Sequence, residues 1–146
     1  MERNVENTTK YLMFKTGGQF YGMPIPPVLQ IVVQENITPV KDCPAYIKGT
    51  VEFKGAVIPV IDLLFCLCSE STPLSERNCI VVLSIEEERK GYLVENVIEV
   101  VDIPEKMEVP ASLTEKPEHR FLDGMGSAKG QDIFLMDVPN LLSVLA

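Results

Sequence analysis

Residues 46–63, YIKGTVEFKGAVIPVIDL, decide the fold because a related stretch follows later in the chain, at residues 121–138, FLDGMGSAKGQDIFLMDV. The two stretches align without a gap: each has an aromatic, an aliphatic and a charged residue before glycine, then Lys-Gly, then an apolar run that reaches aspartate. A weaker echo places residues 22–31 over residues 91–100. Because repeats at a fixed spacing indicate duplicated structural units, we interpret the chain as two related half-length units of short strands.

The remaining sequence alternates short apolar runs with turn signals, a spacing typical of barrels and sandwiches. Turns are expected at Gly17-Gly18, at Gly55 and at the acidic residues 86–88. One or two helical turns are expected after Asp62 and after Asp137, each of which can cap a helix. Strands are expected at residues 11–16, 19–23, 28–34, 49–54, 56–61, 79–85, 90–94, 96–101 and 133–136. The pattern predicts an all-β fold with short helical segments.

Loops are expected at residues 35–48, 69–78 and 102–120, and residues 1–9 are interpreted as a flexible tail. Units of this size bury too little apolar surface to be stable alone. We therefore expect residues 10–146 to form a single domain of two packed lobes, approximately residues 10–80 and 81–146, with strand exchange between them. Their apolar junction is the natural place for a groove that receives a partner helix.

Composition excludes several functional classes. A hydrophobic content of 46% in 146 residues is sufficient for a packed core, and a formal net charge of −8 opposes nucleic-acid binding. The longest apolar run, residues 56–68, contains Asp62 and is shorter than the roughly 20 residues that span a bilayer. The four cysteines lack a C-x-x-C pair, so Cys66 and Cys68 are interpreted as buried, inert thiols. We expect a cytoplasmic protein with no metal and no membrane insertion.

Three segments, ITPV at 37–40, PAYIKG at 44–49 and KGAVIPVIDL at 54–63, resemble the signature of the CheW family of bacterial chemotaxis adaptors. The resemblance extends over nearly the whole chain. It implies two packed five-stranded SH3-like β-barrels without a catalytic centre or cofactor. It also implies two partners: the signalling tip of a methyl-accepting chemoreceptor in the junction between the barrels, and the regulatory domain of a CheA-type histidine kinase at the end of one barrel.

The same resemblance suggests contact residues. Apolar contacts are assigned by position to Val28, Ile31, Val57 and Val94, although alternating strand burial would also produce this pattern in a core. Lys54 stands where the family usually has arginine and Gln30 where an acidic residue is common. Lysine lacks the planar bidentate fork of a guanidinium, and these departures leave open a diverged protein that binds the kinase or another partner without bridging to receptors.

A rival of a different class is a pseudo-symmetric aspartic protease, because Asp62 and Asp137 occupy equivalent places in the repeat. Leu63-Leu64 and Val138-Pro139 follow these aspartates, where such an enzyme needs a small, hydroxyl-bearing turn that leaves the carboxylates open to substrate. Helix capping is the simpler explanation of both residues.

Overall fold

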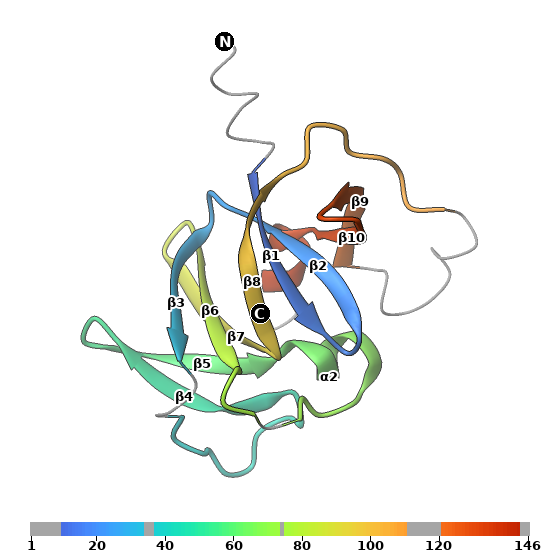
Figure 1. Ribbon diagram of the computed structural model, residues 1–146. Coiled ribbons are helices and arrows are strands. Elements are labelled where there is room, and N and C mark those ends of the chain that lie inside the picture. The colour runs from blue at the N-terminus through green and yellow to red at the C-terminus, as the bar shows by residue number, and fades with distance from the viewer. Residues whose placement is uncertain (1–9, 34–36, 74, 111–120, 144–146) are drawn as a thin grey trace.

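A computed structural model describes residues 10–33, 37–73, 75–110 and 121–143, and these form strands with two short helices (Figure 1). The helices are α2 (Leu63–Cys68) and α4 (Val138–Ser143). The strands are β1 (Lys10–Thr16), β2 (Gln19–Pro24), β3 (Val28–Val33), β4 (Ile47–Phe53), β5 (Ala56–Asp62), β6 (Cys79–Ile85), β7 (Glu88–Val94), β8 (Asn96–Asp102), β9 (Leu122–Ala128) and β10 (Gln131–Met136). The all-β fold class is confirmed. The expected tail at residues 1–9 and residues 111–120 of an expected loop lie outside the described residues.

The strands make two five-stranded sheets, which we call the first lobe (β8-β1-β2-β10-β9) and the second lobe (β3-β6-β7-β5-β4). A boundary near residue 80 separates the two sequence repeats, whereas each lobe takes strands from both sides of it. The repeat is also visible in the register: Leu135 lies opposite Gly22 in the parallel pair β10·β2, and Val60 lies opposite Gly91 in β5·β7. The two repeat units therefore exchange strands to complete both sheets.

Four hairpins close through two-residue turns in which both central residues have positive φ. These turns are Gly17-Gly18, Lys54-Gly55, Glu86-Glu87 and Lys129-Gly130. Positive φ at both positions matches the twist of the adjoining strands, and the turns expected at residues 17–18, 55 and 86–88 are confirmed. Glu86-Glu87 is the one pair of these four that contains no glycine, so both residues adopt a conformation that side chains disfavour.

Strand β9 was not expected from the sequence, since its two glycines and its lack of β-branched residues weaken its strand signal. A Cβ on Gly124 would lie 2.8 Å from the Met107 carbonyl oxygen. That close approach is needed because Met107 and Met125 exchange backbone hydrogen bonds of 2.8 and 2.9 Å along the outer edge of β9. The segment around Met107 thus covers an edge that would otherwise expose unpaired backbone groups.

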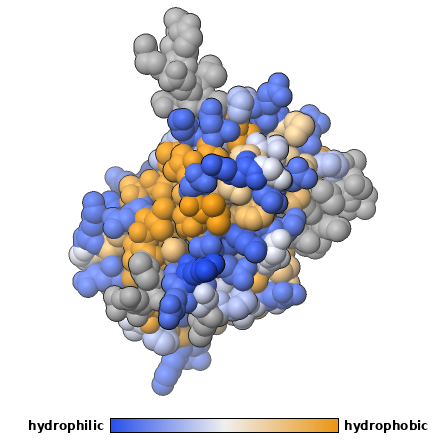
Figure 2. Space-filling view, viewed as in Figure 1, coloured by the Kyte–Doolittle hydropathy of each residue, from blue (hydrophilic) through white to orange (hydrophobic). Residues whose placement is uncertain are grey.

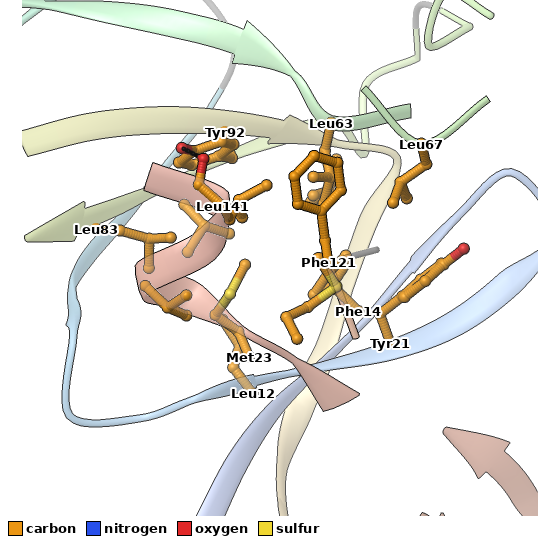
Figure 3. Close-up of a cluster of buried hydrophobic side chains, with 14 of the residues drawn as sticks. Leu12, Phe14, Tyr21, Met23, Leu63, Leu67, Leu83, Tyr92, Phe121 and Leu141 are labelled. Carbon is orange, nitrogen blue, oxygen red and sulfur yellow. Dashed lines mark hydrogen bonds between the residues drawn. The ribbon is translucent and has the colours of Figure 1, made fainter. Parts of the chain in front are cut away.

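The core has three layers, one inside each lobe and the largest between them. In β1, Leu12 and Phe14 face the junction while Tyr11 and Met13 face the interior of the first lobe. Strand β6 alternates in the same way, so both strands are buried on both faces along unbroken apolar runs, residues 11–14 and 80–83. Figure 3 shows side chains of both lobes converging on Phe121 at the junction. The two lobes share one core.

The two helices brace the lobes against each other. Helix α2 follows the second lobe, yet Leu64 lies against Gly17 in the first-lobe hairpin, where an added Cβ would approach Leu64 Cδ1 to 2.6 Å. Helix α4 follows the first lobe, yet its Leu142 carbonyl accepts a hydrogen bond from Lys90 Nζ on β7. Neither helix in the described part of the chain is long and apolar enough to span a membrane.

The expectation of buried thiols was wrong for Cys68, which is exposed, while Cys66 is half-buried. Helix α2 has six residues and turns Leu63, Leu64 and Leu67 inward, so its last position faces solvent.

Candidate protein-docking surfaces

Several large apolar side chains remain exposed. Among the described residues these are Leu29, Ile31, Val40, Val57, Ile98, Val100 and Met107. A contiguous group of such residues on a soluble protein indicates an interaction surface more often than scattered ones do.

We call Leu29 and Ile31 of β3 with Ile98 and Val100 of β8 the seam face, and their exposed fractions are 47%, 40%, 39% and 51%. In the alignment of the two repeats Leu29 corresponds to Ile98 and Ile31 to Val100. The duplication has therefore placed the same pair of exposed positions on one strand of each lobe. Figure 2 shows the hydrophobic band that runs over β8 and β3 on this side of the molecule.

A hollow adjoins the seam face. Its cavity volume is about 420 Å³, and it is lined by Lys10, Ile25, Pro26 and Val100. These residues come from β1, β8 and the crossover that carries the chain from the first lobe to the second. The expected groove at the junction is therefore shallow, because the junction itself is filled by core side chains.

A register shift in β3 determines which of its side chains reach solvent. Val28 lies opposite Leu83 and Gln30 opposite Val82, so Leu29 is the extra residue of a bulge. Val28 packs against the core between the lobes, whereas Leu29, Gln30 and Ile31 are all exposed. Sequence reasoning missed Leu29, Ile98 and Val100; the repeat, which aligns the predicted contact Ile31 with Val100, was a signal that could have identified Val100.

The hairpin between β4 and β5 forms a second surface, the tip face, defined by Lys54 and Val57. Val57 is 70% exposed, and Lys54 occupies the turn with φ +52°. The Lys54 ammonium lies 5.6 Å from the centroid of the Phe53 ring, within the range of a cation–π contact. This ring contact holds the ammonium on the Phe53 side of the hairpin tip, whereas Val57 lies on the other face, opposite the exposed Glu52.

Val94 does not belong to either surface. It is fully buried in the core between the lobes, opposite Cys79, so its assignment as a contact residue is corrected. Strand β7 lies in the middle of its sheet and is covered on both faces, which leaves this position no route to a partner.

The two repeated aspartates have separate structural roles. The Asp62 carboxylate is buried, accepts hydrogen bonds from the Thr72 hydroxyl and from Thr72 N at 2.9 Å, and lies 3.5 Å from Lys48 Nζ. It makes no side-chain cap of α2, so that expectation was wrong. Asp137 does cap α4, accepting a hydrogen bond from Asn140 N at 3.1 Å. Both carboxylates are engaged in local contacts, which does not support the protease interpretation.

Two lobes with exchanged strands, joined by a common core and carrying an exposed apolar face and an exposed hairpin tip, define an all-β module that binds other proteins. Residues 10–146 match the family described as CheW-like domain, and the chain belongs to this family.

Relatives and a solved structure agree with this membership. The chain is 27% identical over 137 residues to the chemotaxis protein CheW of Klebsiella aerogenes, covering 92% of this chain and 81% of that protein. It is 24% identical to CheW of Rhizobium meliloti, covering 89% and 84%. The crystal structure of the scaffolding protein TtCheW from Thermoanaerobacter tengcongensis superposes with a TM-score of 0.77 at 27% identity, covering 88% and 84%. The resemblance inferred from the sequence is confirmed: the chain is a chemotaxis adaptor of the signal-transduction machinery.

Proposed function

We propose that this adaptor couples the cytoplasmic signalling tip of a methyl-accepting chemoreceptor to the regulatory domain of a CheA-type histidine kinase, acting in the cytoplasm without catalysis. The observation that carries the proposal is the presence of two separate exposed surfaces, the apolar seam face and the tip face with its exposed Val57 and Lys54. An adaptor needs two such surfaces because it must hold both partners at once.

We assign the seam face to the receptor. A helical hairpin docks through apolar residues on one side of its helices, and the seam face offers aliphatic side chains from two strands instead of a single deep pocket. The adjoining hollow at Ile25 and Pro26 gives a protruding side chain a place to insert. Gln30, exposed between Leu29 and Ile31, would contribute a neutral polar contact at this surface.

We assign the tip face to the kinase. Val57 supplies an exposed aliphatic anchor, and Lys54 supplies a positive charge at the turn of the same hairpin. Such a combination favours an apolar patch bordered by a carboxylate on the partner. Because lysine binds as a point charge, this ion pair would be less directional than one made by arginine.

Sedimentation of a ternary complex tests the bridging function. The adaptor would be mixed with a soluble receptor cytoplasmic fragment and with the kinase regulatory domain, separately and together, and analysed by sedimentation velocity. We expect a complex that contains all three proteins. The Ile98→Asp variant should lose binding to the receptor fragment and keep binding to the kinase domain, and the Val57→Asp variant should do the reverse. Mutually exclusive binding, or no binding to either partner, would refute the bridging function.

A second candidate is a competitor that binds the kinase without bridging to receptors. It is favoured by Gln30, which is neutral where the family commonly has an acidic side chain. Binding to the kinase domain alone would support this candidate, and restored receptor binding in Gln30→Glu would identify the residue responsible.

A further inference from the structure

A second apolar cavity adjoins the Pro26-Pro27 turn and shares Pro26 with the seam-face hollow. It has a volume of about 440 Å³ and brings together the crossover, the end of β6 and the start of α4. We call it the proline pocket, and its apolar walls are Pro24, Pro26, Pro27, Ile85, Val138 and Pro139. Ser84 also lines it, but the Ser84 amide already donates to the Pro27 carbonyl at 2.9 Å.

The walls determine what kind of group fits. Four of them are prolines, which have no N–H and therefore present saturated rings without donors. Proline rings and aromatic side chains form recurrent contacts in peptide recognition. The cavity volume is within the range that ligand pockets use to enclose a compact group. The proline pocket therefore suits the ring of an aromatic side chain.

The surroundings determine the charge of the occupant. Ile85 leads directly into the turn of Glu86 and Glu87, both exposed, while Glu88 is paired with Lys90 at 2.8 Å. Arg89, opposite Ser84 in the hairpin, offsets part of this charge. Asp137 precedes Val138, and the whole chain carries −8. The potential at the pocket is negative, so a cationic segment is attracted to it and an acidic one is repelled.

We infer that the proline pocket docks a segment of a partner protein in which an aromatic side chain is flanked by lysine or arginine. The aromatic ring would enter the cavity between Pro26 and Pro139, and the basic residues would face Glu86 and Glu87. This contact is additional to the receptor and kinase contacts proposed above and does not depend on them.

Peptide fluorescence tests the inference directly, because the chain contains no tryptophan. The probe is the capped peptide Ala-Lys-Trp-Lys-Ala, and its control has glutamine in place of both lysines. Titration with the intact protein should give a saturable blue shift of the tryptophan emission with the cationic peptide. Pro139→Lys removes one of the proline rings that line the pocket and adds a positive charge, at an exposed position in the first turn of α4. It should weaken binding of the cationic peptide at least about tenfold.

A hairpin variant isolates the contribution of charge. Glu86→Asn combined with Glu87→Gly installs a turn that tolerates positive φ. It should lower the affinity of the cationic peptide by roughly three- to tenfold at low salt, as expected for rim charges. The glutamine peptide should respond equally to both proteins. A purely structural role of the glutamates would leave the affinity of both peptides unchanged.

Two further variants complete the design. Pro26→Lys provides a second wall substitution if Pro139→Lys fails to fold, and Ile98→Asp serves as the matched control on the seam face, expected to bind the peptide normally. The inference is overturned if no saturable shift occurs, or if wall variants bind as tightly as the original protein. Since neither receptor nor kinase is present, this result leaves the proposed adaptor function untouched.

Discussion

Replacing Val57 with aspartate tests whether the tip face binds the kinase, because the substitution should change binding much more than it changes the stability of the fold. Val57 is 70% exposed, so its substitution removes little from the core. Glu52 lies directly opposite on β4, and a second carboxylate there would cost about 0.2–1 kcal/mol through like-charge repulsion. We therefore expect Val57→Asp to fold, with a midpoint of thermal unfolding only slightly below that of the original protein.

The effect on binding is larger. Full burial of a valine side chain contributes about 1.5–3 kcal/mol, so covering the 70% that is exposed contributes roughly 1–2 kcal/mol. Aspartate loses this contribution and adds the cost of an unpaired charge in a desolvated contact. A total loss of at least about 2 kcal/mol corresponds to an increase in Kd of about thirtyfold.

Isothermal titration against the purified kinase regulatory domain measures this change. Val57→Thr preserves the shape of the side chain and should raise Kd by less than about tenfold, because a hydroxyl is less costly to bury than a carboxylate. Ile98→Asp, on the seam face, should leave this Kd unaltered. A folded Val57→Asp protein that binds the kinase domain with unchanged affinity would refute the assignment of the tip face.

Three predictions concern the structure itself. Thr16→Val should raise the free energy of unfolding by roughly 1 kcal/mol, measured by urea titration, because the buried Thr16 hydroxyl has no hydrogen-bond partner; a decrease would contradict this. Lys90→Met should lower the free energy of unfolding by about 1–2 kcal/mol and accelerate amide exchange in α4, because the Leu142 carbonyl loses its hydrogen-bond donor. The control Lys129→Met, which removes an exposed ion pair, should have little effect. Burial raises the pKa of Tyr92 above its ordinary value of 10.0, so stability is intact below that pH and falls as the pH rises above it; Tyr92→Phe should reduce this alkaline loss.

The sequence predicted the hairpins well because their signals are local. Glycine pairs, Lys-Gly and an acidic cluster lie between apolar runs, and each of these turns occurs in the structure. Strand β9 lacked such a signal. Its glycines are required by the segment around Met107 that lies along its edge, a contact between residues distant in the chain. The alignment of residues 47–53 with residues 122–128 was the available evidence for this strand.

The candidate site was predictable to a different degree at each residue. Val57 and Ile31 are exposed, as a contact role requires, but Val94 is buried because β7 lies in the centre of its sheet. Alternation along a strand cannot distinguish these cases, since it specifies which face a side chain occupies and not whether another layer covers that face. Asp62 was misassigned for another reason: its position suits a helix cap, yet its carboxylate accepts hydrogen bonds from Thr72 in the loop that follows α2.

Strand exchange connects the duplication to the binding surfaces. If each repeat unit had formed its own lobe, β3 would belong to the sheet of β1 and β2, and β8 to that of β6 and β7. Instead β3 pairs with β6 and β8 with β1, so the two strands of the seam face are each anchored in the lobe built around the other unit's hairpin. Separating the two repeat units would therefore break strand pairing as well as the shared core. This arrangement gives the seam face a fixed geometry before any partner binds, which lowers the ordering cost of docking a helical hairpin across it.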